Sequence, residues 1–496
     1  MHKARTQLLL VFIGVFLFNF LFWQENFGAN TLIFTLFYLA ALWLLFPKSR
    51  KTRGFMLTAG GALLTALMVV WHNSGAAKFA WLISAMCAAG FAQEHELRFV
   101  FSALRQYLWG WWQSPRHFFE TLNPGTTEGT PRERSFRRSI GLAFVPLLVV
   151  FVFYFLYYFA NDKFAALSDA FWRQVGNLLV FDISVPHLLF VIFGFFMVGA
   201  AFWRNDTSLA KADLAAPDEL QRVRPPRKRY FETLEMLGLR REYRQAILLF
   251  WMLNALLLVV NLTDIRYVWF GFDEAAQQDL KGYVHKGTYF LIASILLAMA
   301  VLFYVFRKNL NFLPRNKNLK TAAGIWLIQN AVLAISVCVR NGRYIDFHGL
   351  AYKRIGVILF LALVFFGLIT LWHKIRDCRT MSWLWRQNGW AFYTLLLLNA
   401  CISWDVLITR YNLSSRPKGA IDVQYMINEV SDKNLFLLEE NFDSLAQKEM
   451  YPVMAESDIR RGIERKRQIF NVKMRDISWK SWNGADARNQ LNSPSE

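Results

Sequence analysis

The ionisable residues best placed for chemistry lie where long apolar runs end. In "NLTDIRYVWFGF" (261–272), Asp264 and Arg266 follow an almost unbroken apolar run and precede aromatic residues. An arginine can hold a carboxylate or a phosphate through two parallel, charge-assisted hydrogen bonds. Such residues therefore suit either an ion pair that joins helices or a site for an anion.

Three further segments bring ionisable residues to similar positions, namely "YVHKGTY" (283–289), "RNGRYIDFHGLAYKR" (340–354) and "WDVLITRYN" (404–412). The four segments together predict one polar cluster, made of Asp264, Arg266, Tyr283, His285, Lys286, Arg340, Arg343, Asp346, Arg354, Asp405, Arg410, Tyr411 and Asn412. Its arginines need partners, and the candidates are Asp264, Asp346, Asp405 or an external anion. The cluster is either a salt-bridge network that locks spans together or a ligand site, and we favour the network.

Enzymatic chemistry has little support in this sequence. His285 could handle protons or sense pH because imidazole titrates near neutrality, although a lone histidine at a membrane interface more often has a structural role. Asp264 or His285 could serve as a general base in a membrane-embedded transferase. The sequence has no glycine-rich phosphate loop, nucleophile elbow or zinc-ligand spacing. We therefore predict no catalytic residue, no metal and no cofactor, and we favour a protein that is not an enzyme.

Composition places these residues in a membrane protein. Hydrophobic residues make up 55% of the 496 residues and aromatic residues 17%, and runs of about 20 apolar residues can cross a bilayer. The predicted fold class is all-α, a polytopic transmembrane helical bundle of about 11 spans with a small C-terminal helical extramembrane region. The predicted spans are Thr6–Trp23, Thr31–Phe46, Gly54–Trp71, Phe79–Ala92, Ile140–Phe159, His187–Trp203, Ala246–Leu262, Val284–Phe306, Thr321–Val339, Ile355–Trp372 and Gly389–Trp404.

The charge distribution predicts the orientation of the chain. The net charge of +20 arises from Lys and Arg residues in short loops between apolar runs, which is typical of topology signals rather than of nucleic-acid binding. Alternate assignment of the loops puts most of these cations on one side when the N-terminus is cytoplasmic. The C-terminus and the polar cluster are then external. The segment 79–92 is the weakest span, and everything after it would invert if it did not cross.

Hydropathy divides the chain into four regions: 1–139, with about four spans and a cytoplasmic amphipathic loop; 140–244, with two spans and a basic loop; 245–404, with about five spans; and 405–496. In the last region, helical spacing of apolar residues predicts a helical hairpin with a cap at Ser431 or Asp432, then a basic helix over 459–475, then a disordered tail from Gly484. Asn254 and Asn261 share one helix face, so we expect them to form interhelical hydrogen bonds, as we do Gln329 and Asn330. Amphipathic helices are predicted near residues 97–111 and 164–180.

The stretches "TDIRYVWFGF", "YVHKGTYFLIASILLAMAV", "YKRIGVILFLALVFFGLITLW" and "WDVLITRYNL…IDVQYM" together resemble a bacterial multi-pass membrane family known only by a "domain of unknown function" label, of the 4153/4173 type. The resemblance runs from about Asn254 to Leu438, and the N-terminal half shows no recognisable motif. It implies a protein of the bacterial cytoplasmic (inner) membrane and offers no catalytic residue to transfer.

Three functions remain open. The first is a non-enzymatic regulatory, sensing or scaffolding role at the outer face of the membrane. The second is a transporter or a lipid- or anion-handling protein in which Arg340, Arg343 and Arg354 hold an anionic group. The third, a membrane-embedded transferase, ranks last. The expected partners are membrane lipids, with an envelope protein or an anionic ligand as further candidates, and no nucleic acid.

Overall fold

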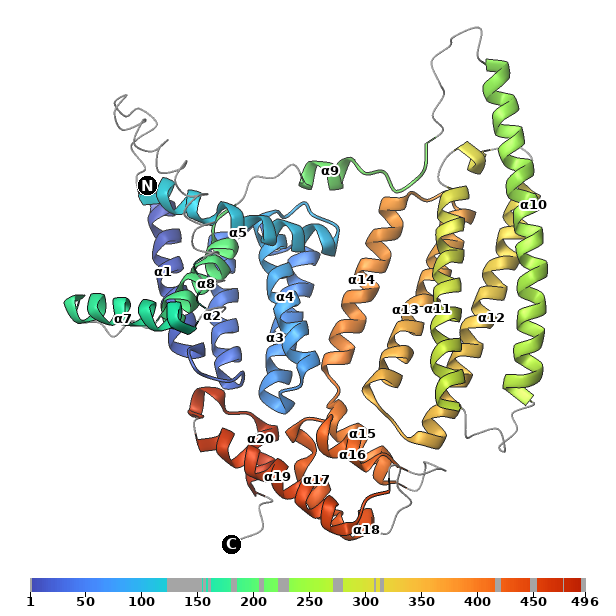
Figure 1. The fold of residues 1–496 in the computed structure, drawn as a ribbon. Helices are drawn as coiled ribbons and strands as arrows, with labels where there is room; N and C mark the ends of the chain where they lie inside the picture. The colour runs from blue at the N-terminus through green and yellow to red at the C-terminus, as the bar shows by residue number, and fades with distance from the viewer. Residues whose placement is uncertain are drawn as a thin grey trace. The chain divides into compact units, whose positions relative to one another are not determined.

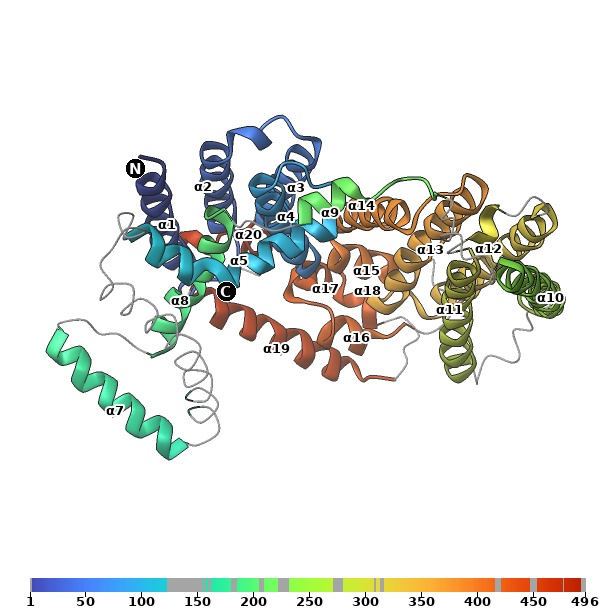
Figure 2. The ribbon, with the colours of Figure 1, turned by 90° about the horizontal axis from the view of Figure 1, so that it is seen from above.

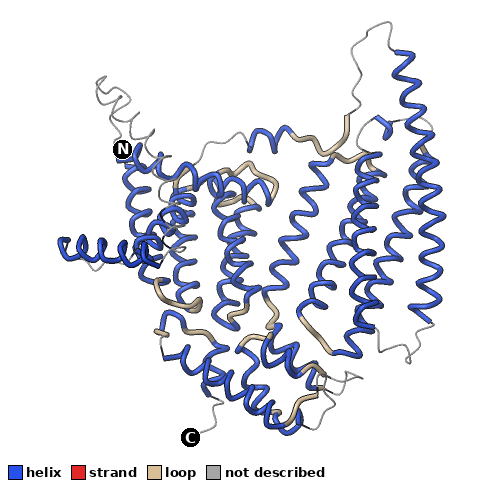
Figure 3. Tube along the Cα trace, viewed as in Figure 1, coloured by secondary structure: helices blue, strands red, loops and turns tan. Residues whose placement is uncertain are grey.

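The computed structural model describes residues 2–122, 154, 158, 162–179, 185–204, 209–221, 232–270, 280–306, 309–312, 316–414, 421–446, 453–475 and 477–491. Helices of widely different length make up nearly all the regular structure in these ranges, and none of the described residues forms a strand (Figure 3). Isolated β-bridge pairing occurs between Glu219 and Arg379. The all-α fold class predicted from the sequence is confirmed.

The chain forms two compact units. Unit 1 comprises residues 1–213 together with 477–484, and unit 2 comprises residues 214–476 together with 485–496. The four-part division predicted from hydropathy rests on a different criterion and stays a prediction.

Unit 1 is built of helices (Figure 1), most of them apolar and two of them amphipathic. Its helices are α1 (His2–Phe22), α2 (Ala29–Leu45), α3 (Arg53–His72), α4 (Gly75–Gln93), α5 (Val100–Leu122), α7 (Asp162–Leu179) and α8 (Val185–Phe202), with short 3-10 turns at Pro47–Ser49 and Trp479–Ser481. The short helix α9 (Leu209–Ala215) contains the boundary between the two units. Helix α5 packs on α4 and α8 and buries Tyr107, while Phe101 and Leu108 on its other side are exposed. Helices α5 and α7 confirm the two predicted amphipathic helices.

Unit 2 contains a group of long helices, in which α10, α11 and α13 pack on α12 and α14 packs on α13 (Figure 2). These are α10 (Glu232–Asp264), which continues as a π-helix (Ile265–Phe270), α11 (Leu280–Val305), α12 (Lys317–His348), α13 (Tyr352–Arg376) and α14 (Met381–Ala400), with a 3-10 turn at Asn309–Phe312. The core shared by α10, α11, α12 and α13 is apolar and includes Phe250, Leu302, Leu333 and Leu361. We call the end at which α10, α12 and α14 finish and α13 begins the polar end.

Every predicted span in the described ranges overlaps a helix, whereas 140–159 lies outside them except for Tyr154 and Tyr158. Six described helices are long and apolar enough to cross a membrane, including Gly75–Gln93, the weakest prediction. The last predicted span lies mostly in α14, which is followed after a 62° bend by α15 (Trp404–Leu413). If this bent pair of helices is one span, it is the seventh candidate. Three further apolar helical stretches of 10–17 residues are Ala29–Leu45, Pro186–Phe202 and Phe290–Val305. The chain is therefore membrane-embedded by length and composition, and the count of eleven spans stays a prediction.

A C-terminal region of short helices follows α14 at the polar end of unit 2 (Figure 1). It contains α15, α16 (Val423–Asn428), a 3-10 turn (Asp432–Asn434), α17 (Leu435–Glu440), α18 (Phe442–Ala446), α19 (Glu456–Arg475) and α20 (Gly484–Leu491). Ser431 caps the turn by accepting a hydrogen bond from the Lys433 amide, as predicted. The prediction of disorder from Gly484 is wrong for residues 484–491, which form α20 with Asp486 and Asn489 buried.

Candidate functional site

Polar side chains seven residues apart on α10 join this helix to α12. Asn254 donates from Nδ2 to the carbonyl oxygen of Ala322 (2.9 Å), Asn261 donates to that of Gln329 (3.0 Å), and Gln329 donates to Asn254 Oδ1 (2.8 Å). These amides donate across the helix pair, two to backbone carbonyl oxygens and one to a side chain, because lipid supplies no alternative acceptor. The predicted interhelical hydrogen bonds are confirmed for these residues, whereas Asn330 donates within its own helix to Trp326.

At the polar end, α10 and α12 are joined by an ion pair. Asp264, the last residue of α10, forms an ion pair with Arg340, and the two side chains are only 8% and 10% exposed. Past Asp264 the chain winds into the π-helix, where Trp269 donates to Ser336 (2.8 Å) and its carbonyl oxygen accepts from Arg343 (2.7 Å). The end of α10 is therefore held to α12 by one ion pair and two hydrogen bonds, and we call these contacts the α10–α12 clamp.

A second group of contacts surrounds Asp405, the second residue of α15, which is 3% exposed. Its Oδ1 accepts from the Tyr352 hydroxyl (2.5 Å) and from the Ser431 amide (3.1 Å). The Tyr352 amide in turn donates to the Tyr425 hydroxyl (3.0 Å), and burial raises the pKa of Tyr425. We call this the Asp405 network, because one carboxylate links the start of α13 to the C-terminal region.

The turn between α12 and α13 is held by Asn412. Its amide pairs with both backbone groups of Leu350: Oδ1 accepts from the Leu350 amide (2.6 Å) and Nδ2 donates to the Leu350 carbonyl oxygen (3.0 Å). Arg354 donates to the carbonyl oxygens of His348 and Gly349, and its guanidinium lies 4.3 Å from the centroid of the Tyr344 ring. The backbone of this turn is thereby satisfied by side chains from α13 and α15.

The other predicted cluster residues lie apart from these contacts. Arg266, Asp346 and Arg410 are exposed, and Tyr411 packs in an apolar cluster with Ile408. Tyr283, His285 and Lys286 lie in the first turns of α11, and their side chains are outside the described part of the chain. That all thirteen residues form one site stays a prediction. Sequence reasoning did not select Ser336, Tyr352 or Tyr425, and it selected Ser431 only as a helix cap and not as a partner of Asp405.

Within the C-terminal region, four charges hold α20 in place. Lys433 pairs with Asp486, and Lys473 lies 2.6 Å from Asp432 and 3.5 Å from Asp486. Burial alone would raise the pKa of Asp432, but the neighbouring charges of Lys433 and Lys473 outweigh it and the pKa is lowered. Asn489 completes the contact by donating to the Asp432 carbonyl oxygen (2.8 Å).

Lys466 lies inside this region with its amine surrounded by acceptors. It donates to the carbonyl oxygens of Met426 (3.1 Å) and Val430 (2.9 Å) and to Asn434 Oδ1 (2.7 Å). Burial lowers the pKa of Lys466 to about 8, against the opposing charges of Asp432 and Asp405. The amine therefore loses its proton in a range in which a solvated lysine stays charged.

The low pKa of Lys466 predicts how stability changes with pH. Between about pH 8 and pH 10.5 the unfolded chain keeps a proton that the folded chain has released, so stability rises with pH in this window. We expect wild type to gain about 2 kcal/mol relative to Lys466→Met between about pH 8 and pH 9.5. Thermal unfolding of both proteins in one detergent over this range measures the difference. A difference that does not change with pH would contradict the prediction, even if the variant is less stable throughout.

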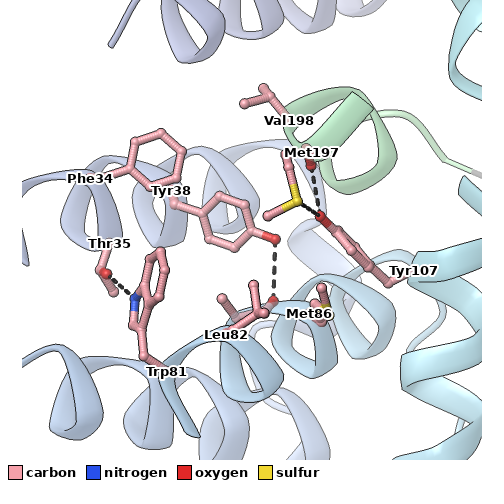
Figure 4. A pocket seen from close by; sticks show the side chains of 10 residues that line it. Phe34, Thr35, Tyr38, Trp81, Leu82, Met86, Tyr107, Met197 and Val198 are labelled. Carbon is pink, nitrogen blue, oxygen red and sulfur yellow. Dashed lines mark hydrogen bonds between the residues drawn. The ribbon is translucent and has the colours of Figure 1, made fainter. Parts of the chain in front are cut away.

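A small apolar cavity lies in unit 1 between α2, α4, α5 and α8 (Figure 4). Its polar tips are satisfied: the Tyr38 hydroxyl donates to the Ala85 carbonyl oxygen (3.2 Å), the Tyr107 hydroxyl to that of Met197 (3.0 Å), and the Trp81 indole to Thr35 Oγ1 (2.7 Å). Among the described residues no group of three or more His, Cys, Asp or Glu side chains could hold a metal ion.

A family model matches most of the chain. The model of a domain of unknown function, DUF4153, matches residues 8–441. The chain belongs to this family. The DUF4153 match extends well before Asn254, so the family pattern includes the N-terminal half, in which the sequence showed no recognisable motif. No curated protein and no solved structure matches the chain.

Proposed function

We propose that this DUF4153 protein is a non-enzymatic regulatory, sensing or scaffolding component of the bacterial cytoplasmic membrane. In this proposal the C-terminal region binds an envelope component, and two connections pass that event on: the Asp405 network to the start of α13, and Asn412 to the turn between α12 and α13. The observation that carries the proposal is the burial of Asp405 between the start of α13 and the C-terminal region, with hydrogen bonds to both. A buried carboxylate that links two elements makes the position of one depend on the other.

The charges of unit 2 support an external C-terminal region. At the end opposite the polar end, α10, α12, α13, α14 and the connection between α13 and α14 carry a set of cations: Arg240, Arg241, Arg244, Lys317, Lys320, Lys374, Arg376, Arg379 and Arg386. Cations are retained on the cytoplasmic side of bacterial membranes. We therefore propose that this end is cytoplasmic and that the polar end, with the C-terminal region, faces outward.

The packing of unit 2 supports this role over transport. The residues buried between α10, α11, α12 and α13 are mostly apolar, and the amides of Asn254, Asn261 and Gln329 donate hydrogen bonds across the contact between α10 and α12. In addition, Arg340 pairs with Asp264, and Arg343 donates to the Trp269 carbonyl oxygen. These contacts within the protein favour a structural role for the two arginines over binding of an anionic solute.

Complementation of a deletion strain tests the proposed role. Asp405→Asn keeps the shape of the side chain but replaces the charged carboxylate by a neutral amide, whose oxygen is a weaker acceptor for the Tyr352 hydroxyl and the Ser431 amide. We expect this variant to insert in the membrane, to fail to complement, and to show faster amide hydrogen exchange at residues 348–354. Asp443→Asn, which changes an exposed aspartate of α18, is the matched control and should complement. Full complementation by Asp405→Asn with faster exchange at 348–354 would show that this coupling has no role in function.

A further inference from the structure

The segment Ile477–Gly484, "ISWKSWNG", belongs to unit 1 although the residues on both sides of it belong to unit 2. It docks on the connection between α1 and α2. The Asn26 amide donates to Ser481 Oγ (2.8 Å), and the Ala29 amide donates to the Trp482 carbonyl oxygen (2.9 Å). Ser481 and Asn483 are each 1% exposed. The segment is therefore fixed in place rather than lying loosely on the surface.

Glu25 is the ionic centre of this contact. Its carboxylate accepts from the hydroxyls of Ser478 (2.5 Å) and Ser481 (2.6 Å), and the Lys480 amine lies 3.6 Å away. Burial alone would raise the pKa of Glu25, but the two hydroxyls and Lys480 outweigh it, so the pKa is lowered and the group stays charged at neutral pH. Glu25 thus holds the segment through three of its residues, Ser478, Lys480 and Ser481.

Close backbone contact explains two glycines. A Cβ on Gly28 would overlap the carbonyl oxygens of Ser481 and Trp482, and a Cβ on Gly484 would lie 2.8 Å from the carbonyl oxygen of Trp71. Trp71 is near the end of α3, and Gly28 precedes α2. The segment therefore touches the ends of three apolar helices of unit 1.

The docked segment lies at the edge of a lipid-facing surface. Lys480 places its amine 4.4 Å from the centroid of the Phe20 ring. Phe20 is 47% exposed near the end of the candidate span Arg5–Phe22, and its ring stacks with that of Phe16, which is 68% exposed. Exposed phenylalanines on a spanning helix face hydrocarbon, and lysine extends its amine from such a surface toward water.

Three tryptophans in or next to the docked segment are exposed. Trp479 and Trp482 are 62% and 54% exposed, and Trp71 is 67% exposed. Tryptophan concentrates at the headgroup level of membranes because its ring is apolar and its N–H is polar. We propose that residues 477–484 are an interfacial anchor and that their partner is the phospholipid headgroup layer, into which Trp479 and Trp482 insert. The surface is continuous with the lipid-facing side of α1, which favours lipid over a second copy of the chain or another protein.

Depth-resolved fluorescence on the full chain tests the anchor. An environment-sensitive fluorophore is attached at Trp479→Cys or Trp482→Cys, with the four native cysteines replaced, and the protein is placed in phosphatidylcholine–phosphatidylglycerol nanodiscs. We expect blue-shifted emission and strong loss of fluorescence with lipids that carry a spin label just below the headgroup. Phe16→Cys, in the span, should respond more to a deep spin label, and Val453→Cys, 90% exposed in the C-terminal region, should respond to neither.

Two outcomes would overturn the proposal. Water-like emission at both positions would mean that the tryptophans do not enter the membrane. Blue-shifted emission without quenching by spin-labelled lipid would mean that protein covers them. Gly28→Ala provides an independent check, because the added Cβ displaces the segment and should reduce the lipid quenching at Trp482→Cys. Gly60→Ala, which meets no atom within 4 Å, should leave it unchanged. Unchanged quenching in Gly28→Ala would refute the docked anchor.

Discussion

Asp264→Ala is expected to lower the free energy of unfolding by about 3–5 kcal/mol, the usual cost of removing one partner from a buried ion pair. The loss exceeds the worth of a surface ion pair because Arg340 stays at 10% exposure without its carboxylate. Because α10 is also held by Asn254 and Asn261, we expect the helix to remain inserted while its polar end loosens. Unfolding by titration with SDS in mixed micelles measures the change.

Two variants separate the ion pair from general damage to α10. The double variant Asp264→Leu with Arg340→Met removes both charges, and we expect it to recover much of the loss because an apolar pair of similar size avoids the desolvation of two ions. Arg266→Ala changes a neighbouring exposed arginine and should have an effect within about 0.5 kcal/mol. If Asp264→Ala were as stable as Arg266→Ala, the α10–α12 clamp would not stabilise the protein.

The helices of this protein could be predicted because hydropathy and length are local properties of the sequence. A run of about 20 apolar residues must hydrogen-bond its own backbone in lipid, so each such run forms a helix. Asn254 and Asn261 were also interpretable, since their spacing of seven puts both on one face. The bend between α14 and α15 could not be read in this way, because the run continues through Ile402 while the chain turns.

The choice of partner among the polar residues could not be predicted. Four charged segments reach similar depth, and the sequence gives no distance between them, so Asp264, Asp346 and Asp405 were equal candidates for the arginines. In the structure Asp264 pairs with Arg340, whereas Asp405 accepts from Tyr352 and the Ser431 amide. Pairing across helices depends on their rotation and register, which a single sequence does not fix.

The tail beyond Gly484 was mispredicted for a related reason. Its composition is polar, and polar segments usually cannot bury enough apolar surface to fold. Here α20 is ordered by polar contacts: Asp486 meets Lys433 and Lys473, and Asn489 meets the Asp432 carbonyl oxygen. Such partners lie more than ten residues away along the chain, beyond the reach of any local pattern.

Gly349→Ala is expected to destabilise the polar end by about 2–4 kcal/mol, through backbone strain and the loss of hydrogen bonds. Gly349 has φ 76° and ψ −172°, a conformation that only glycine adopts readily. A Cβ there would also overlap Asn412 Oδ1, the atom that accepts from the Leu350 amide. The substitution therefore strains the turn and displaces the amide that joins it to α15.

The matched controls are Gly342→Ala in α12 and Gly356→Ala in α13, where a Cβ meets nothing within 4 Å. Both lie inside helices, so alanine should be neutral or stabilising by up to about 1 kcal/mol. Hydrogen exchange at residues 348–354 should rise in Gly349→Ala and stay unchanged in the controls, and Asn412→Ala should reproduce part of the rise because it removes the same bonds to Leu350. If Gly349→Ala left both hydrogen exchange and unfolding unchanged, the turn would not depend on its contact with Asn412. The connection through Asn412 would then be removed from the proposed function, and Asp405 alone would connect the C-terminal region to the long helices.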